Sequence, residues 1–156
     1  MAARSVTIGD GLVSWLNDVA RAWPLAFTAV RTYEAAATLE GLDDALLVEL
    51  VPPAEPEAEE AMTRGTESQD YPFLLGVRER YSSSGAIAAS WVDARVELVE
   101  LIADALPGVF LSGMGSGFQV WCESTRPAPL WDPESLRDQR TFLGVVEILM
   151  REHRPK

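Results

Sequence analysis

Cys122 and His153 are the only cysteine and the only histidine of the sequence, and these two residue types can form a thiol nucleophile with its general base. No local motif of a nucleophile surrounds Cys122, and alternation with Phe118 and Val120 places its side chain on the apolar face of a predicted strand. A buried thiol is inert. With one histidine, a zinc set cannot be assembled either. We therefore expect a core cysteine, no catalytic residues, no metal site and no cofactor.

A glycine cluster, Gly113 to Gly117, has the composition of a phosphate-binding loop. Phosphate loops lead from a strand into a helix, because the amides and the dipole at the helix N-terminus bind the anion. The cluster here follows a predicted helix and precedes a predicted strand, so the order is reversed. We interpret it as a flexible connector and not as a nucleotide site.

Acidic residues gather between positions 52 and 70, which hold six carboxylates against Arg64 and so carry −5 of the net charge of −11. The densest run comprises Glu55, Glu57, Glu59 and Glu60. It lacks the alternating ligands and the turn glycine of a calcium loop. An acidic, proline-rich segment does not bury enough apolar surface to order itself. Residues 52–70 are therefore predicted to be a mobile acidic loop.

Four further residues are candidates for a protein interface. Arg78 and Arg80 lie on one face of a predicted strand, where they either pair with the acidic loop of a neighbouring subunit or form a solvated face. Leu130 and Trp131 end a proline-rich loop that begins at Pro127. An aromatic residue on such a loop is either an interface anchor or a lid folded over the sheet edge. Both alternatives stay open on the sequence alone.

The composition is that of one globular domain covering residues 1–156, with 47% apolar and 24% charged residues. Acidic residues outnumber basic ones by 24 to 13 and no basic run occurs, which argues against a protein that grips nucleic acid. No apolar stretch reaches the roughly 18 residues of a membrane span, and the first residues lack the apolar run of a signal peptide. A single cysteine forms no internal disulfide, which fits a reducing cytoplasm.

Hydrophobic periodicity predicts the main elements. Helical spacing predicts a helix over residues 8–23, begun by a capping box at Thr7 and ended by Pro24. A second helix is predicted over residues 86–106. Alternation and β-branched content predict five strands, over residues 27–33, 46–51, 71–81, 117–123 and 142–150.

Smaller signals complete the chain. Asp132 as N-cap and Pro133 at the first helical position predict a short helix before the last strand. That last strand is apolar enough to lie centrally in a sheet. Residues 151–156 are predicted to be a polar C-terminal tail. Three tryptophans fall on the predicted buried faces of the helices and are expected in the core: Trp15, Trp23 and Trp91.

The predicted order is thus α-β-β-β-α-β-(short α)-β. The strands come in groups and do not alternate one for one with helices. This favours an α+β fold, with a mostly antiparallel sheet of about five strands and two main helices packed on one face.

Several short motifs occur in the order found in a known family. Val51-Pro52 ends the second predicted strand, and Tyr71 to Val77 has the form Tyr-x-Phe-x-Leu-Gly-Val. Trp131 to Leu136 precedes a strand of the form Phe-x-x-Val-x-x-Ile, within Phe142 to Leu149. By this order and spacing, over nearly the whole chain, the sequence resembles the small tail-terminator or tail-completion (neck) proteins of long-tailed bacteriophages and prophages.

The resemblance implies a structural subunit of the virion, made in the host cytoplasm and without catalytic residues. Such subunits close into a hexameric ring on the tail tube, stop tube elongation and offer a surface to the head-completion or connector protein. DNA passes through the ring without specific binding, and no membrane takes part. Because a negative lining repels phosphates, we hypothesise that the acidic run beginning at Glu55 faces the lumen.

Two alternatives remain. One is another head–tail connector or tail assembly protein on a related plan. The other is a small cytoplasmic α+β domain that binds a ligand, or catalyses a reaction, in an apolar pocket. A ring-sized species in size-exclusion chromatography with light scattering favours a terminator over an enzyme, as do neighbouring tail genes.

Overall fold

The computed structural model describes residues 3–34, 45–54, 60–61 and 66–155. The elements that follow one another in this part of the chain are α1 (Arg4–Asn17), a 3-10 turn η1 (Val19–Arg21), β1 (Ala29–Arg31), β2 (Leu47–Val51), β3 (Glu60–Ala61), β4 (Thr66–Arg80), α2 (Ala89–Ala105), β5 (Gln119–Pro127), α3 (Pro133–Gln139) and β6 (Thr141–Pro155). The strands join in one sheet, so the predicted α+β class and the predicted order of elements are confirmed.

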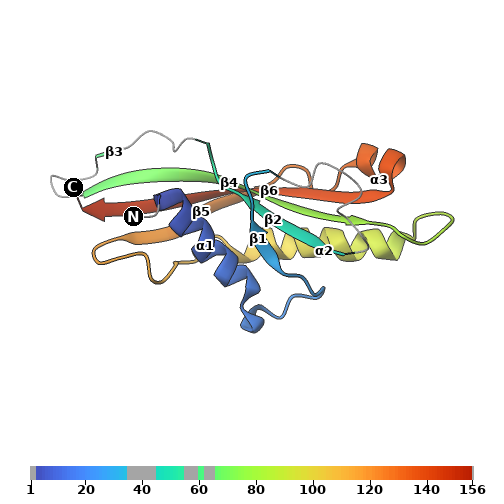
Figure 1. Ribbon diagram of the computed structural model, residues 1–156, viewed down its shortest axis with the longest axis horizontal. Coiled ribbons are helices and arrows are strands. Elements are labelled where there is room, and N and C mark those ends of the chain that lie inside the picture. The colour runs from blue at the N-terminus through green and yellow to red at the C-terminus, as the bar shows by residue number, and fades with distance from the viewer. Residues whose placement is uncertain (1–2, 35–44, 55–59, 62–65, 156) are drawn as a thin grey trace.

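The two longest strands form the axis of the molecule. β4 and β6 pair antiparallel along their whole length, from Thr66 opposite Pro155 to Arg80 opposite Thr141. The sheet order is β1-β2-β4-β6-β5, with β3 beside β4, and β1 pairs with β2 in parallel. Figure 1 shows β4 and β6 side by side along the long axis. The predicted central position of the last strand is therefore confirmed, and the sheet is mostly antiparallel.

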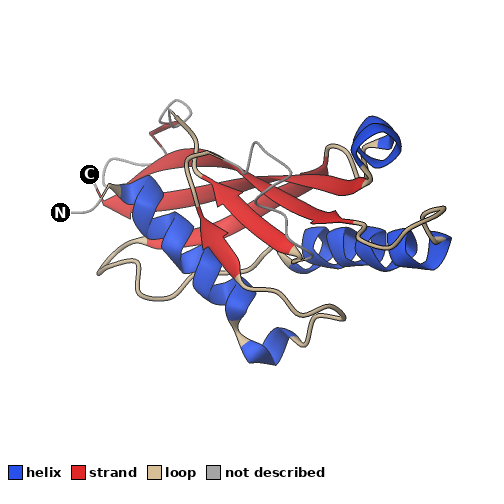
Figure 2. Ribbon diagram, turned by 45° about the vertical axis from the view of Figure 1, so that its right-hand side comes forward, coloured by secondary structure: helices blue, strands red, loops and turns tan. Residues whose placement is uncertain are grey.

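One face of the sheet carries the core. Alternate residues of β4 are buried, namely Tyr71, Phe73, Leu75 and Val77, and alternate residues of β6 lie beside them, namely Phe142, Val146, Ile148 and Met150. Both long helices cover this face, and their buried residues join the same cluster. Figure 2 shows α1 and α2 along the strands and α3 at the end of the sheet.

Helix α1 begins and ends earlier than predicted. Ile8, Leu12 and Leu16 recur every four residues and are buried, which gives the helix its apolar stripe. The capping box at Thr7 is wrong, because the helix already begins at Arg4 and the Thr7 hydroxyl donates to Ala3 O within it. The predicted end at Pro24 is also wrong.

Helix α1 ends at Asn17, whose side chain binds the backbone of β1. Its amide nitrogen donates to Ala29 O at 2.9 Å, and its amide oxygen accepts from Ala29 N at 2.7 Å. Asp18 then accepts from Ala20 N and starts the turn η1, while Trp23 Nε1 donates to Leu16 O. Asn17 thereby holds the outer edge of β1 with hydrogen bonds that a further strand would otherwise use.

The predicted loop over residues 52–70 and the predicted tail over residues 151–156 both contain β-strand. Residues 66–70 belong to β4 and residues 60–61 form β3, so the predicted loop over 52–70 is wrong there. Residues 151–155 continue β6 and are not a tail. The physical reason is pairing: Glu67 lies opposite Arg154 and Asp70 opposite Arg151, so these polar residues extend the ladder as ion pairs.

The remaining boundaries are close to the predicted ones. Helix α2 begins at Ala89, three residues later than predicted, and ends at Ala105. β5 continues to Pro127, past a bulge between Cys122 and Ser124 that a strict alternation does not reveal. The three tryptophans expected in the core pack against it and stay partly exposed.

Candidate functional site

The outer face of the sheet, opposite α1 and α2, is a surface that neither of these two helices covers. It is formed by alternate residues of β4, β6 and β5: Pro72, Leu74, Gly76, Arg78, Leu143, Val145, Glu147, Leu149, Arg151, Ser124 and Arg126. Leu74 is its most exposed apolar side chain, at 47%. A mixed apolar and charged face of this kind is suited to contact with another protein.

A shallow groove of about 640 Å³ crosses this face. Its walls include Pro53 and Ala54 after β2, Pro72 and Leu74 of β4, and Leu149 of β6. Proline cannot donate to a ladder, and Pro72 lies in the stretch of β4 between the residues paired with β2 and those paired with β3. The groove is therefore a consequence of where β2 leaves the sheet.

Ion pairs cross the outer face between neighbouring strands. Arg126 donates to Glu147. Arg151 donates to Asp70 twice, from Nε to Oδ1 and from Nη2 to Oδ2. Arg151 also lies 3.3 Å from Glu123, whose other carboxylate oxygen accepts from Trp121 Nε1. These pairs stabilise the register of the strands. The sequence alone does not show which arginine pairs with which carboxylate.

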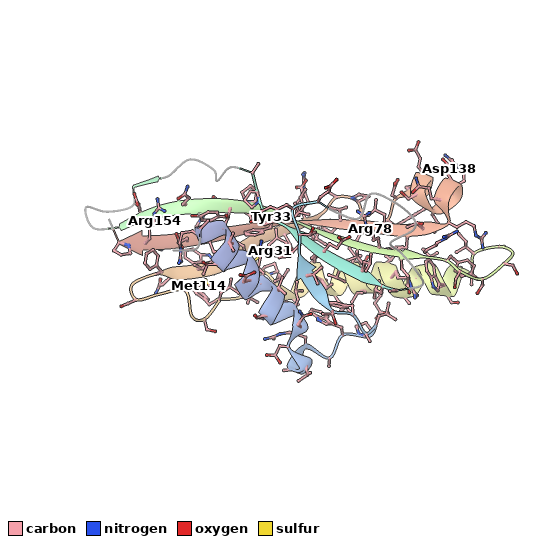
Figure 3. All side chains as sticks on the ribbon, viewed as in Figure 1. Arg31, Tyr33, Arg78, Met114, Asp138 and Arg154 are labelled. Carbon is pink, nitrogen blue, oxygen red and sulfur yellow. The ribbon has the colours of Figure 1, made fainter. Side chains whose placement is uncertain are left out.

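The two arginines predicted at an interface differ in their surroundings. Arg78 is mostly buried and lies 3.7 Å from Glu49 of β2, so it has a partner in its own chain. Figure 3 places it toward the α3 end of the long strands. Arg80, two residues on, is exposed at the end of β4 and has no carboxylate partner among the described residues. The solvated and the interfacial interpretation both stay predictions, and Arg80 is now the better candidate for an intermolecular pair.

The segment that holds Leu130 and Trp131 runs along β6 past the end of β5. Ala128 N donates to Val145 O, Val145 N donates to Pro129 O, and Asp132 N donates to Leu143 O. The backbone thus covers the edge of β6, as in the lid alternative. Leu130 packs against the core, whereas the Trp131 side chain remains 42% exposed.

A recess lies between this segment, α3 and the turn before α2. It measures about 470 Å³ and is lined by Ile87, Trp131, Pro133, Leu136, Arg137 and Arg140. Four of its lining residues are apolar, and the other two are arginines. Arg137 pairs with Asp138 at 3.0 Å, and Arg140 donates to Ser83 O at 2.7 Å. Figure 3 shows Asp138 on α3 at one end of the molecule, away from Arg154 at the other.

The acidic run predicted at the lumen falls largely outside the described residues. Glu55, Glu57 and Glu59 are not described, and Glu60 is described only as the first backbone position of β3. The lumen hypothesis therefore stays a prediction.

Cys122 and His153 lie on opposite faces of the sheet and cannot act as a pair. Cys122 is buried on the core face beside α2, and its burial raises the pKa of its thiol from 9.0 to about 11. His153 lies on the outer face, with its ring 4.4 Å from the ring of Trp121 in an edge-to-face contact. The predicted core cysteine is confirmed.

Sequence reasoning missed a buried charge beneath α1. Glu152 is on the core face of β6 with 0% exposure, and both Nε and Nη2 of Arg4, the first residue of α1, donate to its Oε2. Glu152 Oε1 is buried and has no hydrogen-bond partner among the described residues, with Arg154 Nη1 3.9 Å away. The sequence signal for this buried charge was the i, i+2 alternation along β6, which places Glu152 on the same face as Met150 and Ile148.

The described ranges contain no group of three or more His, Cys, Asp or Glu side chains placed to hold a metal ion. None of the helices found there is long and apolar enough to cross a membrane. Comparison with protein-family models and with curated proteins finds no match to this chain.

Proposed function

We propose that this chain is a tail terminator of a long-tailed bacteriophage. It closes as a hexameric ring on the tail tube, stops tube elongation and forms the surface that joins the tail to the head. The proposal is supported by the placement of the motifs that carry the family resemblance. Tyr71 to Val77 lies inside β4, Trp131 to Leu136 leads into α3, and Phe142 to Leu149 lies inside β6.

The distribution of polar groups also supports a function through protein–protein contacts. The described ion pairs are spread over the sheet and serve strand register or helix docking. The one thiol is buried, and the one histidine makes an edge-to-face contact with a tryptophan. The outer face and the recess beside α3, by contrast, offer exposed apolar side chains next to charges, as protein interfaces do.

The decisive test is deletion of the gene from the genome that carries it, followed by electron microscopy of the particles. We expect tails of irregular, excessive length that are not joined to heads, and restoration of normal tails when the chain is supplied from a plasmid. Tails of normal length joined to heads in the deletion strain would refute the proposal. A defect confined to joining, with normal tube length, would instead identify another connector protein.

A ligand-binding function is favoured by one observation, the apolar groove of about 640 Å³ on the outer face. Grooves of this volume accommodate small molecules. Leu74→Arg would place a charged side chain in the apolar wall of this groove. If the groove serves a small ligand, this substitution abolishes binding of that ligand and leaves tail length unchanged. If the outer face instead contacts another protein of the tail, the substitution alters tail length.

A further inference from the structure

We infer that the recess beside α3 binds helix α2 of a second copy of this chain, which gives the head-to-tail contact of the ring. The inference rests on the proposed function and adds the two surfaces that meet. A ring requires a heterologous contact, in which two different patches of one subunit join. The recess and the outer side of α2 are such a pair, because the recess is lined by two arginines and no carboxylate, whereas the outer side of α2 carries carboxylates.

The outer side of α2 is acidic. Four carboxylates recur at spacings of four, three and four residues, so they form one stripe along the exposed side of the helix: Asp93, Glu97, Glu100 and Asp104. None of them makes an ion pair with any described residue. Leu101 lies beside the stripe and is 39% exposed. The surface is thus an apolar side chain bordered by unpaired negative charges.

The recess has the opposite pattern. It is lined by apolar side chains, among them Trp131, Pro133 and Leu136, and by the two arginines Arg137 and Arg140. Its volume of about 470 Å³ is ample for an inserted leucine side chain. An apolar residue in a pocket with charges at the border is the arrangement that gives protein contacts both their affinity and their specificity.

The supply of unpaired arginines points to the same place. Most described arginines are paired with carboxylates of their own chain. Three described arginines lack such a partner: Arg21, Arg80 and Arg140. Two of these lie together at the α3 end, since Arg80 pairs in the ladder with Thr141, next to Arg140. Arg137 is also at this end, although Asp138 offsets its charge, and Glu134 lies on the same helix.

Net charge favours such a contact. Each copy carries −11, so two copies repel each other at long range, and a contact that pairs opposite charges offsets part of this repulsion. Leu101 lies 12 residues along α2 from its first residue, Ala89, which corresponds to about 18 Å of helix. Leu101 and the recess are therefore separate on one subunit, so that each can contact a different neighbour in a closed ring.

Charge reversal tests the contact. We would prepare Glu97→Arg with Glu100→Arg (the α2 variant) and Arg137→Glu with Arg140→Glu (the α3 variant), and measure self-association of the intact chain by sedimentation velocity. Each variant should associate at least about 100-fold more weakly than the wild type, because like charges then meet at the contact. An equimolar mixture of the two variants should associate again, since reversed α2 meets reversed α3.

Controls separate the contact from general charge effects. Arg21→Glu and Glu34→Arg change exposed charges away from both patches, and they should associate as the wild type does. Thermal unfolding followed by circular dichroism checks that each variant is folded. The inference is overturned if the wild type does not self-associate, if either variant associates normally, or if the mixture fails to recover. The deletion phenotype tests the terminator function independently of all three outcomes.

Discussion

Gly144 shows how closely β6 is packed against its surroundings. A Cβ atom there would lie 2.7 Å from Leu130 O and 2.8 Å from Val99 Cγ2 of α2. Gly76 is a matched position on the neighbouring strand, where the nearest atom to a Cβ is Glu49 O at 4.0 Å. Only glycine therefore fits at position 144, for steric reasons and not for backbone conformation.

We expect Gly144→Ala to lower the free energy of unfolding by about 1–3 kcal/mol, because overpacking displaces the segment at Leu130 or helix α2. Gly76→Ala should change it by less than about 1 kcal/mol, because a methyl group fits there. Urea denaturation of both variants measures the difference. Equal effects at the two positions would show that the segment at Leu130 yields easily.

Burial of Cys122 predicts its reactivity. Its pKa is raised to about 11 by desolvation on the core face, so the thiolate is scarce near neutral pH. We expect no reaction with an aromatic disulfide reagent at pH 8 in the folded protein and complete reaction in denaturant. Rapid labelling of the folded chain would contradict the buried position.

The same shift predicts a pH dependence of stability. A pKa raised by folding means that folding favours the neutral thiol, so this contribution is present below pH 9 and is lost as the pH rises through about 11. The stability of the wild type should therefore fall relative to that of Cys122→Ala between pH 9 and pH 11. Parallel curves in that range would refute the assignment.

At the scale of elements, Arg4 and Glu152 dock helix α1 onto the sheet. Arg4→Met leaves Glu152 charged and buried, so we expect a loss of about 3 kcal/mol in the free energy of unfolding. Replacing both residues by methionine should recover most of that loss, because apolar side chains then fill the site. Denaturant unfolding of the single and double variants measures both.

Arg126 provides the control, because its pair with Glu147 is exposed, with 73% and 43% of the two side chains accessible. Arg126→Met should cost at most about 1 kcal/mol. A similar loss for the Arg4 and Arg126 variants would mean that the pair beneath α1 is solvated in solution.

Asn17 protects an edge strand. Its amide occupies the outward N–H and C=O of Ala29, and Asn17→Ala would leave both without a partner. We expect a loss of about 1–3 kcal/mol in unfolding free energy and an increased tendency to aggregate. Urea denaturation and light scattering measure the two effects, and an unchanged aggregation rate would show that β1 is too short to recruit a further strand.

Local patterns predicted the elements better than their ends. The alternation of Tyr71, Phe73, Leu75 and Val77 identified the buried row of β4, because side chains in a strand alternate between faces. The ends depended on contacts distant in sequence. Thr66 to Asp70 looks like loop in isolation and becomes strand because β6 supplies its partners.

The candidate surfaces were predictable only in part. Trp131 was visible as an aromatic residue on a proline-rich loop, and it is exposed. The sequence did not reveal that Arg78 would be taken by Glu49, because that pair depends on the register of β2 with β4. The recess beside α3 was not predictable either, since Ile87 and Leu136 meet only in the folded chain.

At the scale of the whole molecule, charge is the dominant property. The acidic run that includes Glu55, Glu57, Glu59 and Glu60 carries much of the net charge of −11. If it lines the lumen of the ring, replacing these four residues by glutamine should reduce infectivity, because the lining then repels DNA phosphates less. Plaque counts measure this, and unchanged infectivity with normal tails would place the run elsewhere.

The position of β6 governs how the chain acquires its fold during translation. The ribosome makes this strand after every other strand of the sheet, yet β6 separates β4 from β5. Until it emerges, both of its neighbours present unpaired backbone groups, and the nascent chain is open to misassociation. Completion must wait for contacts as distant as those between Thr66 and Pro155, which makes folding slow. Premature termination before β6 therefore leaves β5 without its partner strand and one edge of β4 open, which makes the truncated chain a substrate for chaperones and proteases.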